Sequence, residues 1–376
     1  MNYHEEQKVD SIKKLRKLSY ELPPFLAEYF RGIELNTAER TRLGYAHDLK
    51  IFFHYLVSEV PAFEGKAVGH LTADDLNKVT AGDIEGFLNY VSYYTADPDS
   101  DAEPQEYQNG EKGKARKLAA VRSMFKFFYK KQVVSADPAA LVSTPKIHDK
   151  NIIRLDAGEI ARLLDQVESG EKLSDRQQQY HKLTQLRDVA LITTLLGTGM
   201  RISECVGLDI DDVDFDNNGL RIIRKGGNEA VVYFGGEVRK ALLDYLAERK
   251  QQDTVKGHEN ALFLSMQKKR MSVRAIELLV DKYSKTITTL KHITPHKLRS
   301  TYGTALYNET GDIYLVADVL GHKDVNTTRK HYANMDENRR RAAANAVVLR
   351  DEELAAMKDV NPTVEIEHKK SSDEGK

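Results

Sequence analysis

The sequence has a single cysteine, almost no net charge and no long hydrophobic run. One cysteine, Cys205, excludes both a framework of disulfides and a zinc site made of several thiolates within one chain. Cys205 stands among apolar residues, so we expect a buried structural thiol. No apolar run could span a bilayer and no signal peptide is recognisable, so we expect a cytoplasmic protein with no membrane partner.

Charge is balanced overall but unevenly distributed. The 376 residues suffice for two domains and carry 56 basic and 57 acidic side chains, a formal net charge of −1. Segment 112–131 nevertheless has eight basic and no acidic residues, and segment 268–299 has nine basic and two acidic residues. Two separate basic faces favour a clamp around a nucleic-acid backbone, with solvated helix faces as the alternative. The candidate contacts are Lys114, Arg116, Lys117, Arg122, Lys126, Lys268, Lys269, Arg270 and Arg274.

The first part of the chain has the periodicity of helices. Apolar residues at the spacing of one helical face recur in segments 45–56, 84–91 and 118–132. We read the aromatic residues of the last segment as core rather than as a base-stacking platform. Residues 1–20 are a charged lead-in, loose or helical, and a helical domain is predicted over 21–137.

Two segments interrupt this periodicity. Segment 97–111 holds six acidic residues and two prolines, which predicts an exposed loop pointing away from phosphate. Segment 138–152 lacks helical periodicity and is predicted to be an interdomain linker. A second domain is expected over 153–349, followed by a charged, disordered tail over 350–376.

Local start and stop signals in the second domain predict two consecutive helices. Thr294 is a good N-cap and Pro295 suits the first helical position, so a helix that carries His296 and Arg299 on one face should start there. Gly311 supplies its end. A second helix, capped by Asp312, should end at Gly321 and deliver His322 to a loop. A short segment with Tyr332 follows.

Two further frames lie upstream. The break Gly197–Met200 places Arg201 at the start of a helix that also carries Glu204. Segments 220–225 and 230–234, separated by two glycines, read as a β-hairpin with Lys225 at its tip.

Together these frames present two guanidiniums, an ammonium, two imidazoles and a phenol. Such a set can hold a phosphodiester, neutralise the charge that builds on its oxygens and attack its phosphorus without a metal. The six residues are Arg201, Lys225, His296, Arg299, His322 and Tyr332. His292 and His296 have the spacing of a zinc-binding helix, but Pro295 argues against a continuous helix through both, so no metal site is expected.

The motifs around these residues resemble the active-site boxes of tyrosine recombinases, the group of phage integrases and bacterial Xer proteins. The resemblance rests on the hairpin lysine and on Gly-Met-Arg-Ile-Ser-Glu, His-Lys-Leu-Arg-Ser-Thr, Leu-Gly-His and His-Tyr-Ala, and it is strong over 155–335. Ser300 departs from the second histidine that many members carry there. The resemblance implies a mainly α fold with a small β-sheet: a helical core-binding domain of SAM-like type and an α+β catalytic domain.

The resemblance also implies roles for the six residues. Tyr332 would attack the scissile phosphate and leave a 3′-phosphotyrosyl link and a free 5′-hydroxyl. Arg201 and Arg299 would hold the non-bridging oxygens, while Glu204 supports Arg201. Lys225 would act as the general acid and His296 as a general base or proton relay. His322 would donate a hydrogen bond to the phosphate. Because the phosphotyrosine retains the bond energy, no cofactor is expected.

Partners are implied in the same way. They are double-stranded DNA with inverted-repeat half-sites, other copies of the chain in a tetramer on two DNA sites, and accessory recombination factors. Segment 336–349 reads as a short amphipathic helix that would pack on a neighbouring subunit.

Two other classes are less well supported. A DNA-binding module or directionality factor would not need the six-residue set. A type IB topoisomerase would share the chemistry, but the helical first domain and the segment beyond Tyr332 favour a recombinase. Two roles stay open, Xer-like resolution of chromosome or plasmid multimers and integration or excision of a mobile element. No additional N-terminal arm-binding domain is recognisable, which favours the first role.

Overall fold

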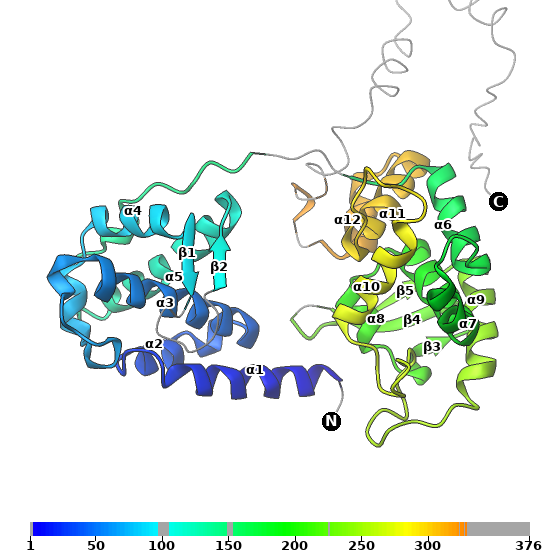
Figure 1. The fold of residues 1–376 in the computed structure, drawn as a ribbon, viewed down its shortest axis with the longest axis horizontal. Helices are drawn as coiled ribbons and strands as arrows, with labels where there is room; N and C mark the ends of the chain where they lie inside the picture. Colours follow the sequence, from blue (N-terminus) through cyan, green and yellow to red (C-terminus); the bar gives the residue numbers. More distant parts are fainter. Residues whose placement is uncertain are drawn as a thin grey trace, which may run out of the picture. The chain divides into compact units, whose positions relative to one another are not determined.

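The computed structural model describes residues 3–96, 105–148, 153–224, 226–322, 324–326 and 328. In these residues the chain is mainly helical, as predicted, and has two small antiparallel sheets (Figure 1). It divides into two compact units. The first unit comprises Met1–Asn151, Ser203–Tyr233 and Gln252–Val273, and the second comprises Ile152–Ile202, Phe234–Gln251 and Arg274–Lys376.

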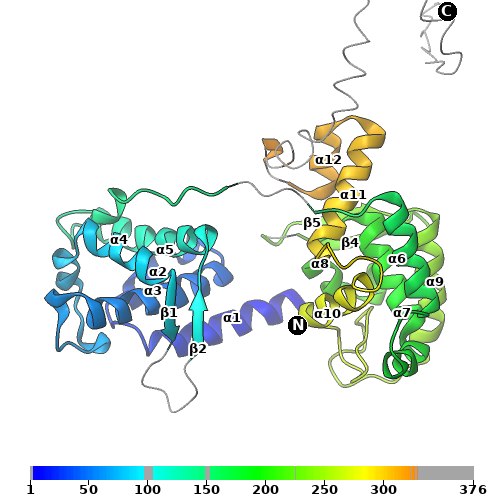
Figure 2. The same ribbon diagram turned by 45° about the horizontal axis from the view of Figure 1, so that its top comes forward.

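The helical part of the first unit is built around an aromatic core. Its helices are α1 Tyr3–Ser19, α2 Leu26–Gly32, α3 Glu39–Glu59, α4 Ala81–Tyr90 and α5 Glu111–Lys130 (Figures 1 and 2). The three apolar stripes predicted from the sequence face one another, and Phe52, Phe87 and Phe125 are fully buried. The lead-in is helical, because Leu15 and Leu18 of α1 reach the same core. Short 3-10 turns connect the helices at Glu34–Asn36, Pro61–Phe63, Val68–His70 and Ala73–Lys78.

The segment predicted to be an acidic loop contains a strand. Strand β1, Tyr93–Ala96, pairs antiparallel with β2, Gln105–Gln108, and the rings of Tyr94 and Tyr107 stack with centroids 5.5 Å apart. The loop prediction was therefore wrong for 105–108. The acidic composition of the segment favours a loop, but the contact between Tyr94 and Tyr107 across the two strands stabilises the pairing. Residues 97–104 lie outside the described residues.

The core of the helical domain also extends beyond the predicted boundary at 137. A 3-10 turn, Pro138–Ala140, is capped by Asp137, and both Ala139 and Val142 are buried in the core. Arg122 fixes this stretch by donating to the Ala139 carbonyl at 3.1 Å and to the Val142 carbonyl. The start of the predicted linker is therefore part of the domain, held by contacts that lack periodicity.

The second sheet has the order β3-β4-β5 and is antiparallel throughout. Its strands are β3 Val213–Asp214, β4 Gly219–Ile223 and β5 Glu229–Tyr233, preceded by a 3-10 turn, Ile210–Asp212. Leu220 lies opposite Val232, and both are buried with Ile222 on one face. This is the predicted hairpin. Lys225, predicted at its tip, lies outside the described residues.

Helices make up the second unit. They are α6 Ala157–Ser169, α7 Asp175–Thr198, α9 Gly236–Arg249, α10 Val273–Ser284, α11 Pro295–Thr310 and α12 Ile313–Leu320, while α8, Ile202–Gly207, starts at its edge. Helix α7 contacts α6, α9 and α11, and Figures 1 and 2 show α6, α7 and α9 side by side. The carboxylate of Asp188 on α7 is fully buried and accepts from Tyr283 of α10 at 2.8 Å, which ties these two helices together.

Within the part of the chain that the structure describes, no helix combines the length and the apolar character that crossing a membrane requires.

Candidate active site

Helix α11 begins and ends where the sequence predicts. Thr294 precedes it in an extended conformation, Pro295 occupies the first turn, and Gly311 ends it with φ 68°. His292 precedes the helix, which confirms that it shares no continuous helix with His296. His296 is exposed in the first turn, and Arg299, one turn later, is only 5% exposed.

Helix α12 ends in a Schellman motif that sets the backbone of His322. Asp312 caps its N-terminus by accepting from the Tyr314 and Leu315 amides. Gly321 adopts the left-handed conformation, with φ 62°, as predicted. Its N–H donates to the Asp318 carbonyl and the N–H of His322 donates to the Ala317 carbonyl, both at 2.8 Å. The local sequence Leu320-Gly321-His322 therefore fixes the backbone position from which the imidazole side chain extends.

Arg201 and Arg299 both donate to backbone carbonyls at the C-terminal end of α12. Arg299 donates through Nη1 to the Gly199 carbonyl at 2.6 Å and through Nη2 to the Leu320 carbonyl. Arg201 donates through Nη2 to the Gly321 carbonyl at 2.9 Å. The C-terminus of a helix has orphan carbonyls and a partial negative charge, so it suits two guanidiniums. The predicted Arg201, Arg299 and His322 are thereby brought together.

Gly199 is a residue of this site that the sequence prediction treated only as a break. It has φ 60°, and a Cβ built on it would lie 2.3 Å from Cδ1 of Tyr302 and 3.0 Å from Cδ2 of Leu320. Only glycine fits both the backbone and the space. The close approach lets the Gly199 carbonyl reach Arg299.

A second residue that the motifs did not single out is Thr328. Its Oγ1 lies 2.8 Å from Nδ1 of His322, and the residue is completely buried. A threonine six residues beyond a histidine gives no periodic signal, so only the three-dimensional contact shows the pair.

Other predicted site residues are placed less fully. Lys225 and Tyr332 lie outside the described residues. Glu204 is 4% exposed in α8, and its support of Arg201 stays a prediction. Among the residues that the structure describes, no group of three or more His, Cys, Asp or Glu side chains could hold a metal ion. Burial raises the pKa of Cys205 to about 12, which fits the expected structural thiol.

Several of the basic candidates have structural partners. Lys117 is 3% exposed, with Nζ 3.1 Å from Oδ1 of Asn109, so we do not offer it as a surface contact. Arg122 holds the stretch after α5, as described above. Arg270 donates to the Val206 and Leu208 carbonyls at 2.9 and 2.7 Å. The sequence pattern missed these roles because the acceptors lie 8 to 64 residues away along the chain, at no helical spacing.

The other basic candidates reach the surface. Arg116 is exposed and pairs with Asp48 at 2.6 Å, and Lys114 is half-buried beside Glu111. The remaining exposed candidates are Lys126, Lys268, Lys269 and Arg274.

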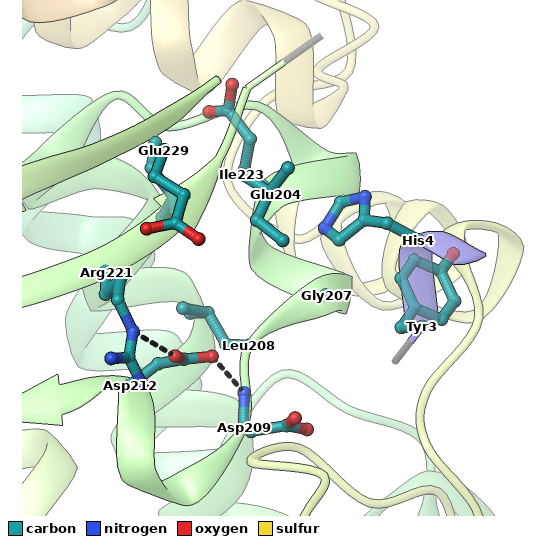
Figure 3. Close-up of a pocket in the computed structure, with 11 residues that line it drawn as sticks. Tyr3, His4, Glu204, Gly207, Leu208, Asp209, Asp212, Arg221, Ile223 and Glu229 are labelled. Atoms are coloured by element: carbon teal, nitrogen blue, oxygen red, sulfur yellow. Dashed lines mark hydrogen bonds and ion pairs between the residues drawn. The ribbon is translucent and has the colours of Figure 1, made fainter. Parts of the chain in front are cut away.

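A cavity of about 200 Å³ in the first unit lies beside Glu204, Asp212, Arg221, Tyr3 and His4 (Figure 3). Arg221 donates to Asp212 at 3.0 Å, and Asp212 accepts from the amide of Asp209 at 2.9 Å (dashed lines in Figure 3). Burial lowers the pKa of His4, and the nearby positive charge of Arg270 lowers it further. None of the six predicted catalytic residues lines this cavity, so we do not place the chemistry there.

The chain is similar to known proteins over most of its length. The phage integrase family matches residues 154–339. The tyrosine recombinase XerC of Caldanaerobacter subterraneus subsp. tengcongensis is 30% identical over 355 residues, which cover 90% of this chain and 92% of that protein. This chain belongs to the tyrosine recombinases of the phage integrase family. It is therefore a site-specific DNA strand-exchange enzyme, as the motifs predicted.

Solved structures share the fold. XerH bound to palindromic difH in a post-cleavage complex has a TM-score of 0.57 and 19% identity over 82% of this chain and 80% of that one. The Tn1549 transposon integrase in complex with transposon right end DNA has a TM-score of 0.58 and 19% identity over 85% of this chain and 97% of that one. The predicted fold class of this recombinase is confirmed.

Proposed function

We propose that this recombinase cleaves one DNA strand by attack of the Tyr332 phenol on the scissile phosphate. The P–O bond to the 5′-oxygen breaks, leaving a 3′-phosphotyrosyl link and a free 5′-hydroxyl, and the reverse attack by a hydroxyl rejoins the strands. The observation that carries the proposal is the convergence of Arg201, Arg299 and His322 at the end of α12. In the sequence, Tyr332 follows His322 by ten residues.

The arginines are proposed to hold the phosphate. A guanidinium has five N–H donors in a planar fork, so one that donates to a backbone carbonyl can also bind phosphate oxygens. The carbonyls of Gly199, Leu320 and Gly321 would set the orientation of both forks before DNA binds. Preorganised donors of this kind stabilise the charge that grows on the oxygens during attack.

The remaining side chains are proposed to transfer protons and to donate hydrogen bonds. Lys225 protonates the departing 5′-oxygen, and His296, exposed in the first turn of α11, accepts or relays the proton of the phenol. His322 donates to a non-bridging oxygen, and Glu204 supports Arg201. The phosphotyrosine conserves the energy of the phosphodiester, so the reaction would need no cofactor.

The proposed partner is double-stranded DNA with inverted-repeat half-sites. XerH is bound to difH, and the lambda integrase is a tetramer bound to a Holliday junction. We infer by analogy a tetramer of this chain on two sites, assisted by accessory factors. The basic residues that reach the surface, Lys114, Arg116, Lys126, Lys268, Lys269 and Arg274, would contact the DNA backbone.

The cellular role is proposed from the relatives. The XerC relative favours resolution of chromosome or plasmid multimers, and the Tn1549 integrase, of the same fold, keeps integration or excision as the alternative. Both roles would place the protein in the cytoplasm with the nucleoid.

A nicked suicide substrate tests the assignment of the nucleophile. Wild type should form a gel-shifted adduct that protease removes, also in excess EDTA, because no divalent ion takes part. Tyr332→Phe should bind the same DNA and form no adduct. An adduct of equal yield from Tyr332→Phe would mean that another residue attacks. Relaxation of supercoils without a defined site would instead favour a topoisomerase.

A further inference from the structure

We propose that Thr328 is a positioning residue for His322, and that its hydroxyl selects the ring tautomer that can donate to the scissile phosphate. The inference rests on the proposed function of His322 as a phosphate donor. It starts from the contact between Oγ1 of Thr328 and Nδ1 of His322, at 2.8 Å.

The backbone of His322 leaves the orientation of its ring undetermined. The Schellman motif fixes the amide of His322 on the Ala317 carbonyl, but the side chain can still rotate about its own bonds. The buried hydroxyl of Thr328 holds the Nδ1 side of the ring. The Nε2 atom lies on the other side of the imidazole. The two contacts together define where Nε2 points.

The same contact determines the location of the ring proton. A neutral imidazole has one N–H and one bare nitrogen, and the hydrogen bond made by one nitrogen decides the state of the other. If the Thr328 hydroxyl donates to Nδ1, the proton lies on Nε2, which can then donate to a phosphate oxygen. If the hydroxyl accepts from Nδ1–H in the neutral ring, Nε2 is bare and would repel the phosphate. In the neutral ring, the proposed role of His322 therefore requires the Thr328 hydroxyl to donate to Nδ1.

The position of Thr328 in the sequence gives the contact a second consequence. Thr328 comes six residues after His322 and four residues before Tyr332. The hydroxyl thus joins the loop of the phosphate donor to the stretch that leads to the proposed nucleophile. Displacement of residue 328 would release the His322 ring as well.

A matched set of variants separates this role from ordinary packing. Thr328→Val keeps the shape and removes the hydroxyl, whereas Thr328→Ser keeps the hydroxyl. The control is Thr304→Val, because Thr304 is also buried and its hydroxyl donates to the Ser300 carbonyl of its own helix at 2.9 Å. Its removal deletes a buried hydrogen bond without touching His322.

The first measurement is the single-turnover rate of adduct formation on the nicked substrate. Thr328→Val should lower this rate about 10- to 100-fold, the scale expected for a misoriented group, with an unchanged Kd for half-site DNA. Thr328→Ser should recover most of the rate, and Thr304→Val should stay close to wild type. Thr328→Val at the wild-type rate, or an equal loss in Thr304→Val, would overturn the proposal.

The second measurement reads the tautomer and does not need activity. Ring-nitrogen NMR of histidine-labelled protein, with the His322 signals identified by their loss in His322→Gln, should show a bare Nδ1 and a protonated Nε2. Thr328→Val should shift this balance. A protonated Nδ1 in neutral wild-type His322 would overturn the inference. Absence of any adduct in wild type would reject the proposed function instead, and the spectra would still decide the role of Thr328.

Discussion

Arg122 in the helical domain and Arg299 in the catalytic region use the same local chemistry for different ends. Each guanidinium donates to two backbone carbonyls, those of Ala139 and Val142 for Arg122 and those of Gly199 and Leu320 for Arg299. Arg122 thereby holds the stretch after α5 against the helical domain. Arg299 has a second guanidinium and an imidazole beside it.

The comparison shows that an arginine at a functional site is recognised by the other cationic groups that gather around the same backbone acceptors. Helix α5 is the more basic segment, yet Lys117 and Arg122 on it are committed to internal acceptors. The end of α12 has no basic residue of its own and receives its charges from distant segments, since Arg201 lies 120 residues from Gly321 in the chain. Local charge density therefore indicates a site less well than shared acceptors do.

The largest contrast is expected from replacing each arginine by lysine. Arg299→Lys should lower the cleavage rate by about 10²- to 10³-fold, because a single ammonium cannot hold two carbonyls and the phosphate oxygens. Arg201→Lys should behave similarly. Rates of covalent capture on the nicked substrate measure both effects.

Arg122→Lys is the control for this contrast. It should cleave at nearly the wild-type rate once folded, and unfold at lower urea concentration because the Ala139 and Val142 carbonyls lose their donor. Similar cleavage rates for Arg299→Lys and Arg122→Lys would show that convergence at α12 has no catalytic importance.

Part of this arrangement could be predicted from the sequence. The ends of α11 and α12 follow from Pro295, Gly311, Asp312 and Gly321, because a proline in the first turn, a side-chain cap and left-handed glycines act locally. The order of the motifs also predicts the six catalytic residues from local sequence, and their roles stay a prediction.

The rest could not be predicted, because it depends on contacts between distant residues. The burial of Val142 and the contact of Arg299 with Gly199 join segments far apart in the sequence, and the pairing of β2 with β1 depends on the contact between Tyr94 and Tyr107. The burial of Lys117 depends in the same way on where Asn109 and Asp48 lie.

A second, smaller effect is expected at Gly199. Gly199→Ala places a Cβ 2.3 Å from the ring of Tyr302, so the chain that carries the acceptor of Arg299 must shift. We expect about a tenfold loss of cleavage rate from this displacement. We also expect a loss of about 2 to 4 kcal/mol in the free energy of unfolding, from overpacking together with the left-handed backbone. Covalent capture and urea unfolding measure the two.

Gly65→Ala provides the matched control, because Gly65 has φ 73° and nothing within 4 Å of the added Cβ. It should lose only about 1 to 2 kcal/mol from backbone strain and cleave normally. If both variants lose the same stability and keep the same rate, close packing at Gly199 does not position Arg299.

The smallest effect concerns the buried carboxyl of Asp48, which lies beside the exposed Arg116 and the buried Lys117 of α5. Burial raises the pKa of Asp48 from 3.8 to about 6, although Arg116 and Lys117 oppose the shift. The folded state therefore favours the protonated carboxyl. The stability from this shift is fully present below about pH 4, the pKa of the unfolded chain, and is lost as the pH rises through about 6.

Urea unfolding of wild type and Asp48→Asn at pH 4 and pH 7 isolates this contribution, because other carboxyl groups cancel in the difference between the two proteins. We expect the variant to be less stable than wild type at both values, since the carboxyl turns one oxygen toward Arg116 and the other toward Lys117, whereas an amide has only one oxygen to offer. We expect the deficit to be larger at pH 4, where wild-type Asp48 has its full contribution. A deficit that is larger at pH 7 would mean that the ionised pair with Arg116 and Lys117 stabilises the fold. Lys117 would then owe its internal position to attraction by Asp48 rather than to burial imposed by the surrounding core.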